Sequence, residues 1–116
     1  MVLNEFKLEF SNAANVEWEL KGDDYKAEFE IGSREHDVWI DKSGKIKKHE
    51  EDFPKGDLPL AISQKLTKEF KGYRIDDVDK IDTEGKVIFL VDLDSNAGDR
   101  KVSFTPEGNI EENKID

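Results

Sequence analysis

Cysteine is absent from this chain of 116 residues, and histidine occurs only twice. The absence of cysteine excludes disulfides, thiolate nucleophiles and cysteine-ligated zinc. Apolar runs are short, the longest being residues 87–91, and none approaches the length of a membrane span. The opening residues lack the basic and apolar regions of a signal peptide, so we expect a chain that is cytoplasmic or has lost its leader.

Acidic residues outnumber basic ones: the chain has 28 aspartates and glutamates and 18 lysines and arginines, which gives a net charge of −10. An acidic surface repels phosphate backbones and anionic lipids, so we expect neither nucleic-acid binding nor membrane insertion. Although 40% of the residues are charged, the apolar residues recur at regular spacings and predict a folded chain. A domain of this size can bury a core without metals or disulfides.

The apolar pattern occurs twice along the chain. The offset between the copies grows within turn-like segments, as expected when a duplicated unit changes its loop lengths. Matched pairs include Phe6 with Leu66, Phe10 with Phe70, Tyr25 with Val87, Phe29 with Val91, Val38 with Val102, and Ile40 with Phe104. We therefore predict a single domain, residues 1–116, made of two repeats, residues 1–52 and 53–116.

Each repeat begins with a helical pattern. Residues 2–10 are predicted to form a short amphipathic helix. In the second repeat, Asp57 can cap a helix and Gly72 can end it. The apolar stripes are Leu3, Phe6 and Phe10 in the first helix and Leu58, Ile62, Leu66 and Phe70 in the second.

After each helix the apolar period changes to two, which predicts half-buried strands between glycine-containing turns. Inward positions of the first repeat include Val16, Trp18, Leu20, Tyr25, Ala27, Phe29, Ile31, Val38, Ile40 and Ile46. Residues 50–56 are predicted to be a linker. The predicted fold class is α+β: a tandem repeat of one helix plus four antiparallel strands, with both helices on one face of a combined sheet and the other face open.

Core and turn motifs carry a family resemblance. They are FSNAANVEWE at 10–19, YKAEFEI at 25–31, VWIDKSGKI at 38–46, and Leu58-Pro59 before the second helix. Together they resemble the PepSY-like family of small secreted or periplasmic bacterial proteins, which is similar in architecture to the tandem repeats of beta-lactamase inhibitory proteins. The resemblance covers nearly the whole chain. It implies export, a non-enzymatic role and protein binding, and it carries over no catalytic residue.

Candidate chemistry is sparse. Neither His36 nor His49 has a second histidine at metal-site spacing, so solvent-facing side chains are favoured over a zinc or acid–base role. No serine lies in a nucleophile-elbow context. We predict a protein that is not an enzyme, with no catalytic residue, no metal and no cofactor.

Residues 92–99 place oxygen-bearing side chains at alternate positions, like the opening of a calcium loop. The match fails at Ala97, where glycine is needed, and at Ser103, where a bidentate glutamate is needed. A polar hairpin loop is therefore favoured, with a calcium site as the alternative. Paired carboxylates elsewhere are expected in solvated turns, namely Asp23 with Asp24, Asp76 with Asp77, and Glu111 with Glu112.

The outward face differs between the repeats. Trp39, Ile88 and Leu90 alternate with inward residues and are predicted to face away from the helices. In the first repeat, Lys26 and Glu28 stand where the second has Ile88 and Leu90. This divergence suggests a docking patch made of Trp39, Ile88 and Leu90. Alternatively, the apolar pair favours strand formation and is covered by lysine stems.

Two functions from different classes are consistent with these features. The favoured one is a non-catalytic secreted or periplasmic module that binds a protein or peptide, inhibitor-like, through the open sheet face. The other is a cell-envelope protein that binds divalent cations or carbohydrate through acidic loops and exposed aromatic residues. A periplasmic or secreted location follows from the resemblance, with the cytoplasm as the alternative.

Overall fold

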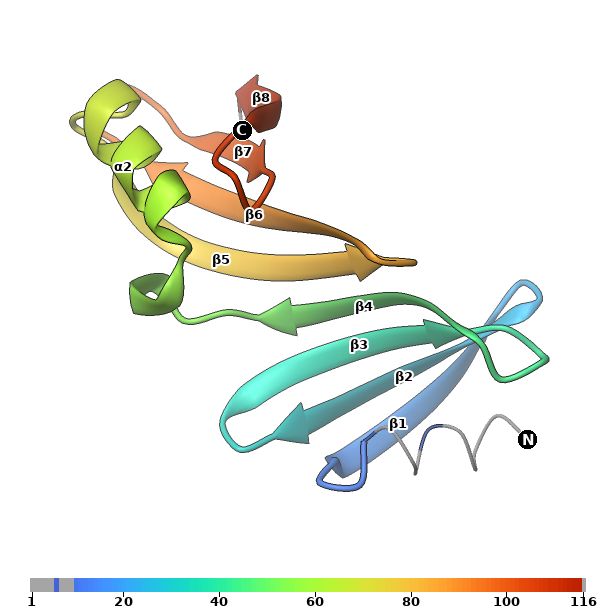
Figure 1. Ribbon diagram of the computed structural model, residues 1–116. Coiled ribbons are helices and arrows are strands. Elements are labelled where there is room, and N and C mark those ends of the chain that lie inside the picture. Colours follow the sequence, from blue (N-terminus) through green and yellow to red (C-terminus); the bar gives the residue numbers. More distant parts are fainter. Residues whose placement is uncertain (1–5, 7–9, 116) are drawn as a thin grey trace. The chain divides into compact units, whose positions relative to one another are not determined.

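The computed structural model describes residue 6 and residues 10–115 (Figure 1). Its elements are β1 (Ala14–Lys21), β2 (Asp24–Ile31), β3 (Arg34–Ile40), β4 (Ile46–Asp52), the 3-10 turn η1 (Lys55–Asp57), α2 (Leu60–Glu69), β5 (Arg74–Thr83), β6 (Lys86–Asp94), β7 (Arg100–Phe104) and β8 (Ile110–Ile115). The strands follow the order β1 to β8 in one antiparallel sheet. No helix within the described part of the chain is long and apolar enough to cross a membrane.

The predicted fold class is wrong in its tandem helices. Among the described residues there is a single α-helix, α2, beside eight strands. The helix expected over residues 2–10 lies outside the described residues except for Phe6 and Phe10, where the Phe10 N–H donates to the Phe6 carbonyl at 2.8 Å. A short helix draws its stability from packing rather than from intrinsic helix propensity. A nine-residue apolar stripe without a start signal is therefore weak evidence for a stable helix over residues 2–10.

The chain divides into two compact units. Unit 1 contains residues 1–51 and 82–86, and unit 2 contains residues 52–81 and 87–116. The organisation as a single domain of two repeats, residues 1–52 and 53–116, stays a prediction.

In unit 2, α2 packs its apolar stripe on strands β5 to β7. The helix begins after Pro59, whose carbonyl accepts hydrogen bonds from the N–H groups of Ile62 and Ser63; Asp57, the predicted cap, lies instead in η1. Gly108 is buried against the same helix, since a Cβ there would lie 2.9 Å from the Ala61 carbonyl oxygen. The core contains Leu58, Ile62, Leu66, Phe70, Val78, Phe89, Val91, Leu93, Val102 and Phe104.

In unit 1, the core is smaller and more aromatic. It contains Phe6, Ala27, Phe29, Val38 and Ile40, with Phe10, Ala13, Val16, Ile31 and Ile46 packed at its margin. The rings of Phe6 and Phe10 each lie 5.0 Å from the Phe29 ring. Period-two alternation holds in β2 and β3. Leu20 of β1 is paired with Tyr25, and Tyr25 with buried Ile40, so Leu20 lies on the inward face as predicted, but its side chain is 65% exposed. As an end strand of the sheet, β1 is covered less completely than its neighbours.

The predicted linker over residues 50–56 is also wrong in part. Strand β4 continues to Asp52, and the Phe53 N–H donates to the Val78 carbonyl at 2.9 Å. The Phe53 ring contacts Phe89 edge-on at 5.2 Å. Glu50 and Glu51 are strand because they pair with Asp37 and His36 of β3, and Phe53 is held because its backbone and ring find partners within unit 2.

Candidate functional site

The outer face of β2–β4 in unit 1 is the surface opposite the core. Its side chains come from residues that alternate with buried Ala27, Val38 and Ile40. Strand pairing arranges these outward residues in cross-strand rows, because directly paired residues point to the same side of a sheet. Two neighbouring rows, one basic and aromatic and one acidic, make up the candidate site.

The basic and aromatic row contains Lys26, Trp39 and Lys48, which are paired across β2, β3 and β4. The half-buried Trp39 ring has the Lys26 ammonium 5.2 Å and the Lys48 ammonium 4.7 Å from its centroid. Both distances suit cation–π attraction. Trp39 is thus held in a defined position with two cations beside it.

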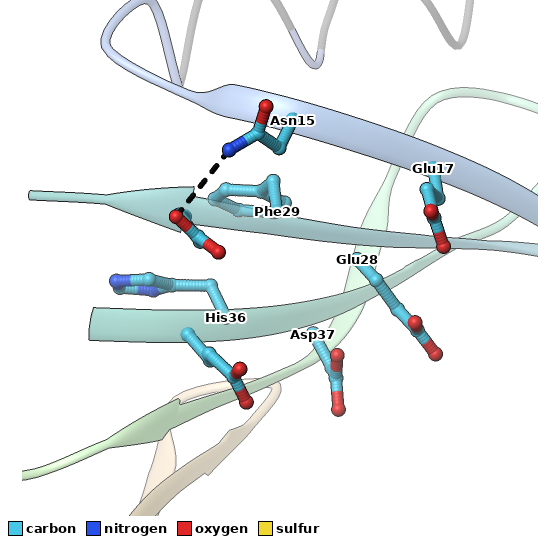
Figure 2. Close-up of a pocket in the computed structure, with 8 residues that line it drawn as sticks. Asn15, Glu17, Glu28, Phe29, His36 and Asp37 are labelled. Atoms are coloured by element: carbon cyan, nitrogen blue, oxygen red, sulfur yellow. Dashed lines mark hydrogen bonds between the residues drawn. The ribbon is translucent and has the colours of Figure 1, made fainter. Parts of the chain in front are cut away.

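The acidic row contains Glu17, Glu28, Asp37 and Glu50, which are paired across β1 to β4. Figure 2 shows the carboxylates of Glu17, Glu28 and Asp37 projecting in the same direction from three neighbouring strands. Glu30 and Glu35 are paired in the next outward row. Like charges placed directly opposite one another destabilise a sheet, so this arrangement works against folding.

A shallow groove of about 230 Å³ runs beside the acidic row. Its lining comprises Asn15, Glu17, Glu28, Phe29, Glu30, Glu35, His36 and Asp37 (Figure 2). The Asn15 amide donates to Glu30 at 3.4 Å on its rim. The groove lies on strands rather than on mobile loops, so the acidic groups are held in place by the sheet.

The electrostatics of the two rows are coupled. Burial raises the pKa of Asp37, the Lys26 ammonium opposes that rise, and Glu28, Glu50 and Glu35 add to it. Lys26 itself forms an ion pair with Glu28 at 3.0 Å, and its hydrogen bond to that carboxylate raises the pKa of Lys26. The acidic row is therefore only partly neutralised from within unit 1, and a cation brought by a ligand would relieve the remaining repulsion.

Ile88 and Leu90 lie on β6, which belongs to unit 2 apart from its first residue. Both are half-buried and alternate with buried Phe89 and Val91. Leu90 is paired with Ser103 of β7. Ile88 and Leu90 therefore belong to unit 2, and Trp39 belongs to unit 1. That the three residues form one docking patch stays a prediction.

The histidines correct the sequence analysis. His36 is only 6% exposed, stacked on Phe29 at 5.3 Å with the two ring planes 9° apart. Its Nδ1 lies 2.8 Å from Nε2 of His49. The prediction of a solvent-facing side chain is wrong for His36, because His36 has the same strand parity as Val38 and Ile40 and so faces the core; His49 is half-buried. That parity was visible in the sequence.

The turn that ends the calcium-like segment is held by its own groups. The Ser95 hydroxyl donates to the Gly98 carbonyl at 2.6 Å and accepts from the Ala97 N–H at 3.2 Å. A different trio, Asp52, Asp77 and Asp79, has ligand oxygens within 4.8 Å of one another. Acidic groups often meet in this way at a surface without holding an ion.

Comparisons with known proteins show the fold. No protein-family model and no curated protein matches the chain. A DUF2874 family protein from Bacteroides uniformis ATCC 8492 superposes with a TM-score of 0.85 at 20% identity, covering 98% of this chain and 86% of that one. A BLIP-like protein from Bacteroides fragilis NCTC 9343 gives 0.82 at 23% identity, covering 98% and 83%.

A third structure, from Bacteroides eggerthii DSM 20697, gives a TM-score of 0.84 at 18% identity, with coverage of 98% and 86%. Its name places it provisionally in the periplasm. At these identities the likeness extends to the fold alone. The chain therefore has the fold of BLIP-like proteins, as the architectural comparison predicted, and the PepSY-like family stays a prediction.

Proposed function

We propose that this protein is a non-catalytic, exported binding module that holds a protein or peptide on the outer face of β2–β4. The observation that carries the proposal is that Trp39 and its two lysines lie beside a row of four carboxylates on one face of the sheet. An aromatic anchor beside fixed charges is the usual composition of a binding hot spot. Trp39 is the proposed contact residue of this face, and Ile88 and Leu90 of β6 are proposed contact residues within unit 2.

The chemistry of this face selects a cationic partner. Asp37 is disfavoured as an anion by burial and by Glu28, Glu50 and Glu35, and a lysine or arginine from a partner would remove that repulsion. The groove beside Glu28 and Asp37 has room for a side chain but not for a large substrate. We therefore propose a basic peptide segment with one apolar residue directed at Trp39.

Export and the absence of catalysis have supporting observations of their own. The solved structures with this fold include one named as BLIP-like and one assigned provisionally to the periplasm. The two histidines contact each other and the rings of Phe29 and Phe10 on the core side of unit 1. Carbohydrate stacking is the weaker alternative, since two lysine ammoniums already lie over the Trp39 ring.

A selection of peptides from a displayed random library tests the proposal. We expect enriched sequences to be basic and to contain one large apolar residue, and their affinity to fall as salt rises. Calorimetry of the enriched peptides should then show a loss of about 2 kcal/mol or more for Trp39→Ala. The triple variant Trp39→Ala, Ile88→Lys, Leu90→Glu tests all three contact residues together.

Two variants make the test specific. Glu28→Gln with Asp37→Asn removes charge from the acidic row, and Lys68→Gln changes an exposed charge of α2 as the matched control. Enrichment of acidic peptides, or equal affinity for wild type and the Trp39→Ala variant, would contradict the proposed face.

A further inference from the structure

The two histidines of the chain form a direct contact on the core side of unit 1. Nδ1 of His36 and Nε2 of His49 are 2.8 Å apart, which is hydrogen-bond distance. Such a bond needs one ring nitrogen that carries a proton and one that does not. The pair can therefore hold one added proton and keep its bond, but it cannot hold two.

Aromatic rings enclose this contact. Phe29 stacks on His36, and Phe10 meets the His49 ring edge-on at 5.2 Å. Phe10 also contacts Phe6 and Phe29. Hence the imidazoles contact Phe29 and Phe10, and those two rings contact Phe6. A change in the imidazole contact therefore reaches Phe10 directly and Phe6 through Phe10 and Phe29.

The charged groups around the pair come from β3 and β4. Glu51 has its Oε2 4.0 Å from Nε2 of His36 and is shared with Arg34 at 3.5 Å. Burial lowers the pKa of His36; Glu51 and, from the outer face, Asp37 oppose the shift, whereas Arg34 adds to it. The rings that contact the pair from β2 and from the described N-terminal residues are uncharged: Phe29 stacks on His36, and Phe10 meets His49.

Unit 2 has a different pair at the equivalent place. Arg100 and Asn113 occupy the positions on β7 and β8 that His36 and His49 occupy on β3 and β4, because Val38 is paired with His49 and Val102 with Asn113. The Arg100 guanidinium donates to the Asn113 amide oxygen at 3.1 Å. Arginine stays charged and asparagine neutral across the physiological pH range, so this bond is insensitive to acid.

We propose that the His36–His49 contact is an acid-sensitive latch that fastens the Phe6 and Phe10 rings to unit 1, while unit 2 keeps an acid-resistant bond at the same position. At neutral pH the shared proton holds the two strands and the rings together. In acid the second proton breaks the bond and sets two like charges inside an aromatic enclosure. Unit 1 then opens before unit 2.

The sign of the pH dependence follows from burial. Because the pKa of His36 in the folded state lies below its ordinary value of 6.5, the open state takes up a proton more readily than the closed state. The stabilisation is fully present above pH 6.5 and is lost as the pH falls through the lowered folded-state pKa. The latch is thus closed at neutral pH and opens in acid.

Amide hydrogen exchange on the full chain tests the latch at about pH 7.5 and about pH 5, with rates divided by their intrinsic values. We expect the protection of the β3 and β4 amides against exchange to fall as the pH drops below 6.5. The fall is up to about tenfold per pH unit for each proton that the open state binds and the closed state does not. Protection in β7 and β8 should change little. The double variant His36→Arg, His49→Asn installs the pair of unit 2 and should remove the difference between the units.

Two results would overturn the proposal. One is equal loss of protection in both units of the wild type. The other is an NMR titration in which both imidazoles protonate independently at the ordinary value of 6.5. Both measurements use the wild-type chain, so they decide the matter even if the double variant does not fold, and neither depends on the proposed binding face.

Discussion

The ammonium of Lys48 lies 4.7 Å from the centre of the Trp39 ring, and the two residues are direct cross-strand partners on β4 and β3. An exposed cation–π contact of this kind contributes about 0.5–1 kcal/mol. The same contact orients the indole that we propose as a binding anchor. Its energy can be separated from simple burial by a double-mutant cycle.

We expect Lys48→Met and Trp39→Leu to show a coupling of about 0.5–1 kcal/mol in urea unfolding. Lys42→Met is the matched control, because Lys42 lies in the β3–β4 loop and pairs only loosely with Asp23 at 3.8 Å. The change in unfolding free energy caused by Lys42→Met should simply add to the change caused by Trp39→Leu, with no coupling between the two. A coupling near zero for Lys48 would mean that the lysine only covers the ring.

Asp37→Asn is expected to stabilise the protein at neutral pH. Because the pKa of Asp37 is raised in the folded state, its ionised form costs stability above that pKa, and the cost shrinks as the pH falls through it. Removing the charge from a row of directly opposed carboxylates should raise the free energy of unfolding by about 0.2–1 kcal/mol.

Unfolding curves at neutral pH and near pH 4 check this prediction, since the gain from Asp37→Asn should be larger at neutral pH. Glu107→Gln, at an exposed position of the turn between β7 and β8, serves as the control for a simple reduction in net charge. An equal gain from both variants would mean that overall charge, and not the acidic row, opposes folding.

Helix α2 offers a matched pair of aliphatic residues. Ile62 is fully buried in unit 2, whereas Leu60, two positions away, is 71% exposed. Ile62→Ala should cost about 2–5 kcal/mol through lost burial and a cavity, and Leu60→Ala less than about 0.5 kcal/mol. Denaturant unfolding measures both, and similar values would show that α2 is docked with a different face.

The strands and the inward face could be predicted because period-two alternation is a local signal. Ala27, Phe29 and Val38 are buried where that pattern placed them. His36 follows the same parity, but a general expectation about histidine outweighed it. The helix predicted over residues 2–10 falls outside the described residues except for Phe6 and Phe10, and nine residues without a cap carry little local information about whether packing will stabilise them.

The cross-strand rows could not be predicted, since they depend on register rather than composition. The two-residue turn at Gly32 pairs Ile31 with Arg34 and so brings Glu28 opposite Asp37. Strand β4 has one extra residue opposite the step from Trp39 to Ile40, so Trp39 is paired with Lys48 and Ile40 with Ile46. No sequence motif marks this shift in register. Turn geometry and bulges decide such pairings.

Gly108 joins the β7–β8 turn to the helix of unit 2. It has a φ of 90°, and a Cβ there would meet the Ala61 carbonyl oxygen at 2.9 Å. Gly85 has nearly the same φ, 92°, but open space around the position of its missing Cβ. The two glycines therefore separate backbone strain from steric contact with α2.

We expect Gly85→Ala to cost about 1–2 kcal/mol, because an L residue is strained in the left-handed region. Gly108→Ala should cost that amount plus about 1–3 kcal/mol, because the added methyl must displace the backbone of α2. Chemical denaturation compares the two directly. Equal losses would show that α2 moves away from the turn at little energetic cost, and that the close approach at Ala61 is not what requires glycine at position 108.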